Sequence, residues 1–197
     1  MPDPMIHETA IVDPGAKIGA GARIWHGVHV CGGAEIGKFR NIGRNVFVAD
    51  VVKIGDRCKI QNNVSVNAGV ELEGEVFCGP SMVFANIRNP RAEIRKPEDG
   101  SGAAGPGAPG RHPGGQLHHR LRRDGCALCV FGAGAVITKD VEDYALWVGN
   151  PGRRIGWMCE CGERLSEALT CSACGAGFAR REDSGLRKIG RGSHLDG

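Results

Sequence analysis

The sequence is poor in aromatic residues: six Phe, three Trp and one Tyr make up 5% of its 197 residues. A core built from this chain therefore depends on Val, Ile, Leu and Ala. Glycine, by contrast, is abundant, and its 32 residues indicate a backbone that turns often and tightly. This composition argues against a helical bundle and allows one principal domain with a small appendage.

The chain also lacks the marks of several other protein classes. No stretch approaches the roughly 18 uninterrupted apolar residues that a membrane span needs. The first ten residues have neither the basic nor the apolar region of a secretion signal. The net charge is +3, and no basic run is long enough to indicate a nucleic-acid surface. We therefore expect a cytoplasmic protein whose partners are neither membranes nor nucleic acids.

An apolar residue stands at every sixth position from residue 6 to residue 84. The series is Ile6, Val12, Ile18, Ile24, Val30, Ile36, Ile42, Val48, Ile54, Ile60, Val66, Leu72, Cys78 and Phe84. The residue four positions further on is small or apolar, except at Arg40 and Arg88. A period of six fits neither a helix nor a single strand, and it requires short strands joined at corners. The pattern predicts an all-β fold, a parallel β-helix over residues 1–95 whose coils stack about 4.8 Å apart; a β-sandwich with accidental spacing is the alternative.

Four stretches carry a more specific likeness. They are KIQNNVSV (59–66), VFCGPSMVFANIRNPRAEI (76–94), GAGAVITKDV (132–141) and YALWVGNPGRRIGWM (144–158). With the repeat, they resemble the hexapeptide-repeat acyltransferases, and among these the bacterial N-acetyltransferases that act on UDP-2-acetamido-3-amino-2,3-dideoxyglucuronate in O-antigen lipopolysaccharide synthesis. The resemblance implies a left-handed β-helix, a homotrimer, and acetyl-CoA in the groove between neighbouring β-helices.

The resemblance also places an asparagine, Asn86, at the catalytic position. Acyl transfer from a thioester to a sugar amine requires a neutral amine and a polarised thioester carbonyl. No histidine stands between His29 and His112, so the coils around residues 60–90 offer no imidazole base. We expect the Asn86 amide to orient the amine or the thioester oxygen, while proximity and the leaving thiolate complete the reaction. A turn residue is the alternative interpretation of Asn86.

A polar patch beside the expected groove supplies candidate substrate ligands. The candidates are Lys59, Gln61, Asn62, Asn63 and His26, with His29 as a further candidate for the nucleotide end. Lys59 suits a uronate carboxylate or a diphosphate. By the resemblance, the residues near acetyl-CoA are Gly132, Ala133 and Lys139. For each candidate side chain, a solvated coil face without a ligand is the alternative.

The repeat stops between residues 96 and 130, in a segment rich in Gly, Pro, Arg and His. One interpretation is a disordered insertion. The other is a pair of compensating frameshifts, because a DNA string that encodes His112 to Arg120, with GC before it and C after it, also reads in a shifted frame as the hexapeptide-like ATLGANCTIV. The frame would be restored near Phe131, where residues 131–157 are predicted to form a last coil and an exit segment. If the segment is genuine, we expect impaired activity.

Four cysteines near the C-terminus form two closely spaced pairs: Cys159 with Cys161, and Cys171 with Cys174. Two thiolate pairs on neighbouring turns close a tetrahedral shell around Zn²⁺. The spacing predicts a structural zinc knuckle over residues 158–178, followed by a flexible tail over 179–197. A redox or disulfide role and idle thiols are the alternatives.

Other functions are compatible with the same coils. The β-helix could serve as a catalytically impaired trimeric scaffold or binding module, which the altered middle segment favours. A carbonic-anhydrase-like site is disfavoured, because the coil histidines His7, His26 and His29 have no spacing that we interpret as a metal set. A zinc-ribbon nucleic-acid binder is a further alternative, suggested by Arg153, Arg154, Arg180 and Arg181 near the cysteines.

Overall fold

The computed structural model describes residues 1–85, 127–182 and 185–191. These residues form strands joined by turns, and they include no helix that could cross a membrane. The chain winds into a left-handed parallel β-helix, which confirms the fold expected from the six-residue repeat. Most of the strands are two residues long, with the first side chain pointing outward and the second inward.

Three strands make one coil, and the strands of successive coils pair to form three faces. Face A contains β1 (Met5–Ile6), β4 (Arg23–Ile24), β7 (Asn41–Ile42), β10 (Lys59–Ile60), β13 (Phe77–Cys78), β15 (Val130–Phe131), β17 (Ala145–Val148) and the antiparallel β18 (Arg153–Trp157). Face B contains β2 (Ile11–Val12), β5 (His29–Val30), β8 (Phe47–Val48), β11 (Ser65–Val66), β14 (Val83–Phe84) and β16 (Val136–Ile137). Face C contains β3 (Lys17–Ile18), β6 (Glu35–Ile36), β9 (Lys53–Ile54) and β12 (Glu71–Leu72).

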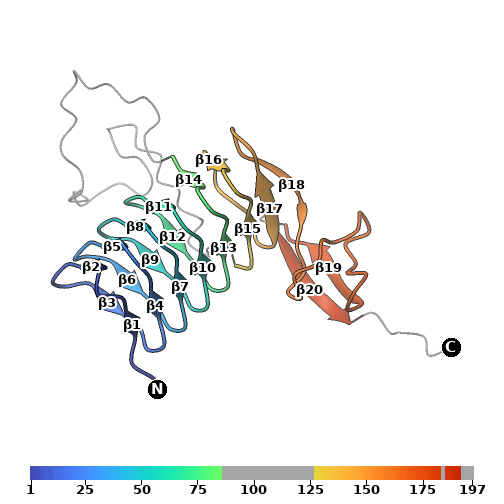
Figure 1. The fold of residues 1–197 in the computed structure, drawn as a ribbon. Helices are drawn as coiled ribbons and strands as arrows, with labels where there is room; N and C mark the ends of the chain where they lie inside the picture. The colour runs from blue at the N-terminus through green and yellow to red at the C-terminus, as the bar shows by residue number, and fades with distance from the viewer. Residues whose placement is uncertain (86–126, 183–184, 192–197) are drawn as a thin grey trace, which may run out of the picture.

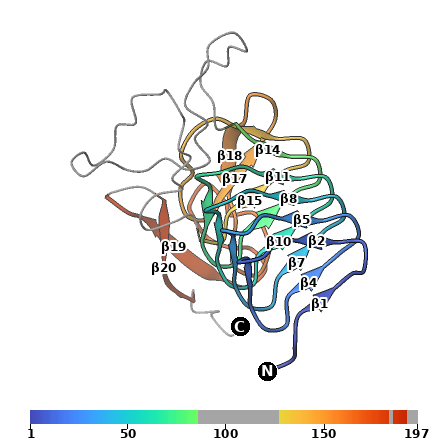
Figure 2. The same ribbon diagram turned by 90° about the vertical axis from the view of Figure 1, so that its left-hand side faces the viewer.

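The register of the faces explains the period of six. Lys59 pairs with Asn41 on one side and with Phe77 on the other, so one coil takes three repeats and each face takes one. The inward residues Ile24, Ile42 and Ile60 stack inside and are fully buried. Figure 1 shows the coils side by side from β1 to β17, and Figure 2 shows the strands of one face in a column.

The coils resume after the altered middle segment without a step sideways. Phe77 pairs with Val130, and Cys78 pairs with Phe131, so β15 stacks directly on β13. In the same way β16 stacks on β14 in face B. Residues 86–126 lie outside the described part of the chain. Strands β15 and β16 therefore continue faces A and B beyond the altered segment.

The C-terminal unit closes one end of the β-helix. β18 folds back on β17, and a hairpin follows that consists of β19 (Ala176–Arg180) and β20 (Leu186–Arg191). Trp157, Phe178 and Leu186 are buried in the same apolar cluster as the coils. The ring of Phe178 also packs edge-on against Tyr144, with centroids 5.1 Å apart. The unit thus shields the last rung of the apolar interior from water.

The hairpin corrects the expectation of a flexible tail from residue 179 onward. Phe178 pairs with Lys188 and Arg180 pairs with Leu186, so residues 186–191 are an ordered strand. Leu186 is 1% exposed. The sequence of this strand is short and mostly polar, so it does not reveal that Leu186 is buried and anchors the strand to the apolar cluster.

Within the described coils, Arg40 is the exception to the rule that inward positions carry small or apolar residues. Its side chain points inward, and the residue is 1% exposed. Its Nη2 donates to Asp56 Oδ1 at 2.9 Å, and the guanidinium also donates to the carbonyl oxygens of Lys38 and Ile54. An added Cβ at Gly37 would collide with Nη2. The glycine therefore opens the passage through which the buried cation reaches its carboxylate partner.

This ion pair leads to a stability prediction. We expect Asp56→Asn to lower the melting temperature by roughly 5 °C or more, because it leaves a buried guanidinium without a counter-charge, whereas Arg40→Met, which removes the charge, has a smaller effect. The Lys38 backbone N–H and, after it, Arg40 hold the pKa of Asp56 below its ordinary value. A lowered pKa contributes stability above the unfolded pKa, and that contribution is lost as the pH falls through the folded pKa.

Urea unfolding of the two variants, measured across the acid range, checks this prediction. We expect the unfolding midpoint of the wild type to fall with pH more steeply than that of Asp56→Asn. Equal destabilisation by both variants at neutral pH would show that packing, rather than the uncompensated charge, dominates at this position.

Candidate functional site

Several predicted ligands meet along one edge of the β-helix, the A/B corner, where each strand of face A turns into face B. His26, Asn62 and Asn63 follow strands β4 and β10 and lie at this corner. Gly132 and Ala133 follow β15 and lie at the same corner. The intervening turn joins them, because Ser81 N donates to Asn62 O and Gly134 N donates to Pro80 O, both at 2.9 Å. Candidates that are far apart in the sequence therefore share one edge.

Lys59 and Gln61 lie beside this corner on face A. Lys59 is the outward residue of β10 and is exposed, between Asn41 and Phe77 of the neighbouring strands. Gln61 follows the inward Ile60 and is half-buried, and its backbone N–H donates to Cys78 O at 3.0 Å. Lys59 is thus close to the corner, and its exposed ammonium is accessible to an anionic ligand.

The two corner asparagines also have structural roles. The side-chain oxygen of Asn62 accepts from Arg44 N at 2.9 Å, and that of Asn63 accepts from Asn45 Nδ2 at 3.2 Å. Asn63 has φ of 59° and Asn45 has φ of 55°, a left-handed conformation that asparagine tolerates. Their amide oxygens therefore hold the corner.

His26 lies two coils below Asn62, about 10 Å away along the axis. Its ring stacks on His7 with centroids 3.6 Å apart, and its Nδ1 is buried without a hydrogen-bond partner among the described residues. Desolvation, followed by the charges of His7 and Arg44, lowers the pKa of His26 below its ordinary value. We therefore expect a neutral imidazole, suited to stacking rather than to binding an anion.

The structure places one predicted residue elsewhere and does not describe another. Lys139 follows β16 and is exposed at the far end of face B, so the structure separates it from Gly132 and Ala133. Asn86, the predicted catalytic residue, lies outside the described residues. The strand that precedes Asn86 and the strand that precedes Lys139 are neighbours, since Val83 pairs with Val136 and Phe84 with Ile137.

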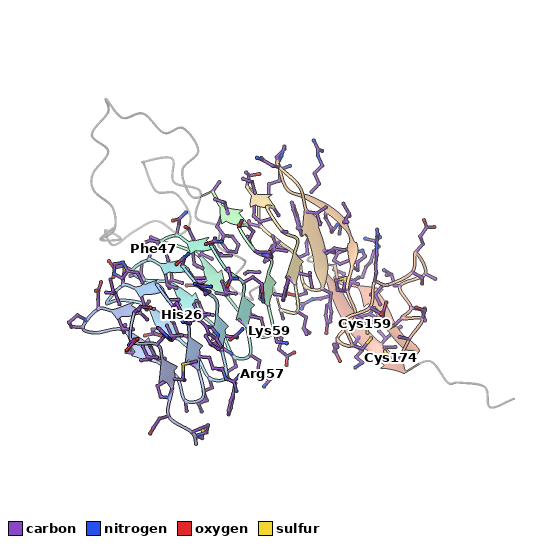
Figure 3. All side chains as sticks on the ribbon, in the orientation of Figure 1. His26, Phe47, Arg57, Lys59, Cys159 and Cys174 are labelled. Carbon is purple, nitrogen blue, oxygen red and sulfur yellow. The ribbon has the colours of Figure 1, made fainter. Side chains whose placement is uncertain are left out.

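The four C-terminal cysteines form one cluster. Cys159 Sγ lies 3.5 Å from Cys174 Sγ, and Cys161 Sγ lies 3.4 Å from Cys171 Sγ. All four sulfurs lie within 4.8 Å of one another. Sulfurs bound 2.3 Å from a tetrahedral zinc are about 3.8 Å apart, so the donor set fits Zn²⁺ with small adjustments. Figure 3 shows Cys159 and Cys174 far along the β-helix from His26 and Lys59, which separates this cluster from the A/B corner.

The backbone of the second cysteine pair favours a thiolate. Backbone N–H groups, first that of Cys174 and then that of Ala173, together with the neighbouring thiols lower the pKa of Cys171 to about 7. Desolvation, in contrast, raises the pKa of Cys159 to about 12. Only a bound cation would bring all four sulfurs into the thiolate form at neutral pH.

Three arginines near the knuckle have partners within the fold. Arg154 lies over the ring of Trp157 at 4.3 Å, and Arg180 lies over the same ring at 5.9 Å. Arg181 forms an ion pair with Asp143 at 3.2 Å. These contacts favour a packing role for the three side chains over a nucleic-acid surface.

A further cluster on face B is missed by the sequence interpretation. Asp13, His29 and Cys31 each offer a donor atom within 4.8 Å of the other two. The signal that could reveal it is the coil length itself, because Asp13 and Cys31 occupy the same place in successive coils. Histidine spacing alone does not find this mixed set, which has one histidine.

These features define a left-handed parallel β-helix built from six-residue repeats, with a cysteine-rich cap. No protein-family model matches the chain. A stretch of 57 residues, 29% of the chain, is 37% identical to dTDP-3-amino-3,6-dideoxy-α-D-galactopyranose 3-N-acetyltransferase from Aneurinibacillus thermoaerophilus, and it spans 30% of that enzyme.

Solved structures agree on the fold. The chain is similar to the acetyltransferase domain of PglB from Neisseria gonorrhoeae, with a TM-score of 0.55 and 18% identity over 77% of this chain and 57% of that one. WeeI from Acinetobacter baumannii gives 0.56 and 19% over 76% and 57%. AntD, an N-acyltransferase from Bacillus cereus solved with dTDP and 3-hydroxybutyryl-CoA, gives 0.54 and 14% over 78% and 79%. The chain thus spans less than two thirds of PglB's acetyltransferase domain and of WeeI.

Proposed function

We propose that the chain is an acetyl-CoA-dependent N-acetyltransferase that acts on the amino group of a nucleotide-linked sugar. The observation that carries the proposal is the A/B corner, where the candidate substrate ligands Asn62 and Asn63 share an edge with the candidate cofactor residues Gly132 and Ala133. The 37% identical stretch of an amino-sugar N-acetyltransferase supports it. AntD, an N-acyltransferase of similar fold, was solved with an acyl-CoA and dTDP.

The finer proposal concerns the substrate. We propose the 3-amino group of a UDP-linked amino-uronic acid of O-antigen synthesis, on the sequence likeness of residues 59–66 and 76–94. The exposed Lys59 beside the corner suits the uronate carboxylate or the diphosphate of such a substrate. The homotrimer remains a prediction of the same likeness, and the trimer would place a second chain's β-helix along this edge. The cytoplasmic location remains a prediction from the absence of a long apolar run and of a secretion signal in the sequence.

In the proposed reaction, the neutral sugar amine attacks the thioester carbonyl carbon of acetyl-CoA. The new C–N bond forms as the C–S bond breaks, and the proton leaves nitrogen for the departing thiolate, giving an amide and free CoA. Asn86 donates its amide N–H to the carbonyl oxygen or accepts from the amine, and so orients the two reactants. Lys59 holds the anionic part of the sugar nucleotide.

Release of the CoA thiol in the presence of acetyl-CoA and the UDP-3-amino-uronate tests the proposal. We expect turnover that Asn86→Ala lowers on the order of 100-fold, since a lost carbonyl-oriented donor typically has this effect. Asn41→Ala is the matched control, because Asn41 Oδ1 accepts from Trp25 Nε1 at 2.6 Å in a coil below the site. Equal rates for wild type and Asn86→Ala would contradict the assigned role.

The scaffold alternative predicts a different result. A catalytically impaired trimer gives no thiol release even with an intact Asn86, and calorimetric titration with acetyl-CoA then separates a binding module from an inert scaffold.

We also propose that Cys159, Cys161, Cys171 and Cys174 hold a structural Zn²⁺ at the end of the β-helix.

A further inference from the structure

Three side chains of different chemistry converge on face B near the N-terminal end of the β-helix. β2 and β5 pair through Ile11 with His29 and through Val12 with Val30. Asp13 and Cys31 are the next residues of these two strands, so they lie one above the other. His29 Nε2 lies 3.1 Å from Asp13 Oδ2, and the donor atoms of the three residues are all within 4.8 Å of one another.

The geometry of these donors is close to that of a metal shell. Nitrogen and oxygen ligands bound 2.0–2.1 Å from a tetrahedral zinc are about 3.3 Å apart, which is near the observed distance between His29 and Asp13. The His29 ring is held by an edge contact with Phe47, with centroids 5.6 Å apart. All three donor residues are half-buried, so an ion from solution can reach them.

The charges around the cluster favour a cation. The carboxylates of Asp13 and Asp50 both interact electrostatically with the side chain of Cys31. Asp50 Oδ1 also accepts a hydrogen bond of 3.0 Å from Gly33 N, which holds that carboxylate in place. Two carboxylates beside the cluster give it a negative potential, which attracts a divalent cation.

We propose that Asp13, His29 and Cys31 form a second metal site for a divalent ion of the Zn²⁺ class. The ion takes one carboxylate oxygen, one imidazole nitrogen and one sulfur, and a fourth position stays open to water. The site differs from the cysteine knuckle in having three protein ligands and solvent access, so its ion exchanges more readily. It lies in the first two coils, whereas Lys59 and Asn62 belong to the coil of β10.

Titration of the full chain with Co²⁺ tests the proposal. We expect a second equivalent of Co²⁺ to bind after the knuckle is filled, with a thiolate-to-cobalt charge-transfer band in the near ultraviolet. Cys31→Ser should abolish the band of this second equivalent, and His29→Ala should weaken its binding at least tenfold. A chelator should remove the second equivalent before the first.

Matched variants separate the two sites. His7→Ala removes a histidine of the same coils outside the cluster and should retain both equivalents, whereas Cys161→Ser should lose the knuckle ion and keep the coil ion. Circular dichroism confirms that each variant is folded, and Asp13→Asn serves as a second probe of nearly the same size. Identical Co²⁺ uptake and spectra for wild type, Cys31→Ser and Asp13→Asn would overturn the proposal.

Discussion

Cys171→Ser is expected to abolish zinc binding at the knuckle and to unfold the C-terminal cap. Cys171 is 1% exposed, and its sulfur lies 3.4 Å from that of Cys161, so its loss opens a shell that four thiolates would close. Structural zinc contributes about 10 kcal/mol or more to the folding of a small unit. Without it, the β19–β20 hairpin is held to the β-helix by the packing of Phe178 and Leu186 and by surface contacts such as the Arg181–Asp143 ion pair.

Zinc content and limited proteolysis measure this effect together. We expect the variant to contain no knuckle zinc and to gain cleavage sites within residues 158–182 that the wild type lacks, while the coils before residue 85 resist the protease in both. Cys58→Ser is the matched control: its sulfur is buried in the coils and donates to Glu73 O at 2.9 Å, a bond that a hydroxyl can keep. A Cys171→Ser chain with unchanged zinc would refute the proposed ligand set.

The parts of the fold that depend on local repetition could be predicted from the sequence. Ile24, Ile42 and Ile60 are buried because the period of six brings each inward position back to the same face every third strand. The same period also singles out Arg40 as an exception. Its partner was not predictable by residue type, because Asp56 reaches it only through the gap at Gly37.

The candidate site was predictable only in part, for physical reasons that differ from residue to residue. Asn62 and Gly132 could be assigned to one corner once their strands were known to belong to one face. The position of Lys139 could not be predicted, because the long segment between β14 and β16 interrupts the repeat. The sequence therefore does not show on which coil the strand before Lys139 stacks. The cluster of Asp13, His29 and Cys31 required the stacking of two coils, which no pattern within one repeat reveals.

The spacing across the altered segment supports the frameshift interpretation. Continued in steps of six beyond Phe84, the inward series would reach position 132, whereas the inward residue of β15 that pairs with Cys78 is Phe131. The chain is therefore one position short of a continuous hexapeptide series. A pair of compensating frameshifts that removes three nucleotides in total deletes one residue, which accounts for this deficit.

A chain with the frame restored over residues 96–130 is expected to release the CoA thiol on the order of 100-fold faster than the chain as it stands, since small displacements of bound reactants typically change rates by this amount. The restored residue brings the period of six back into phase, so that two further coils separate β13 from β15 and extend the A/B corner. Both chains are compared with the same acetyl-CoA and UDP-3-amino-uronate, and Asn86→Ala in the restored chain is the control.

The gene itself supplies the second arm of this experiment. The codons for residues 112–120 must yield a hexapeptide-like peptide in the shifted frame, since the restored coils need an apolar inward residue at every sixth position. If they do not, or if both chains turn over at the same rate, the segment is a genuine insertion that the β-helix accommodates between β14 and β15. The resumed pairing of Val83 with Val136 would then show that a long excursion leaves the register of face B intact.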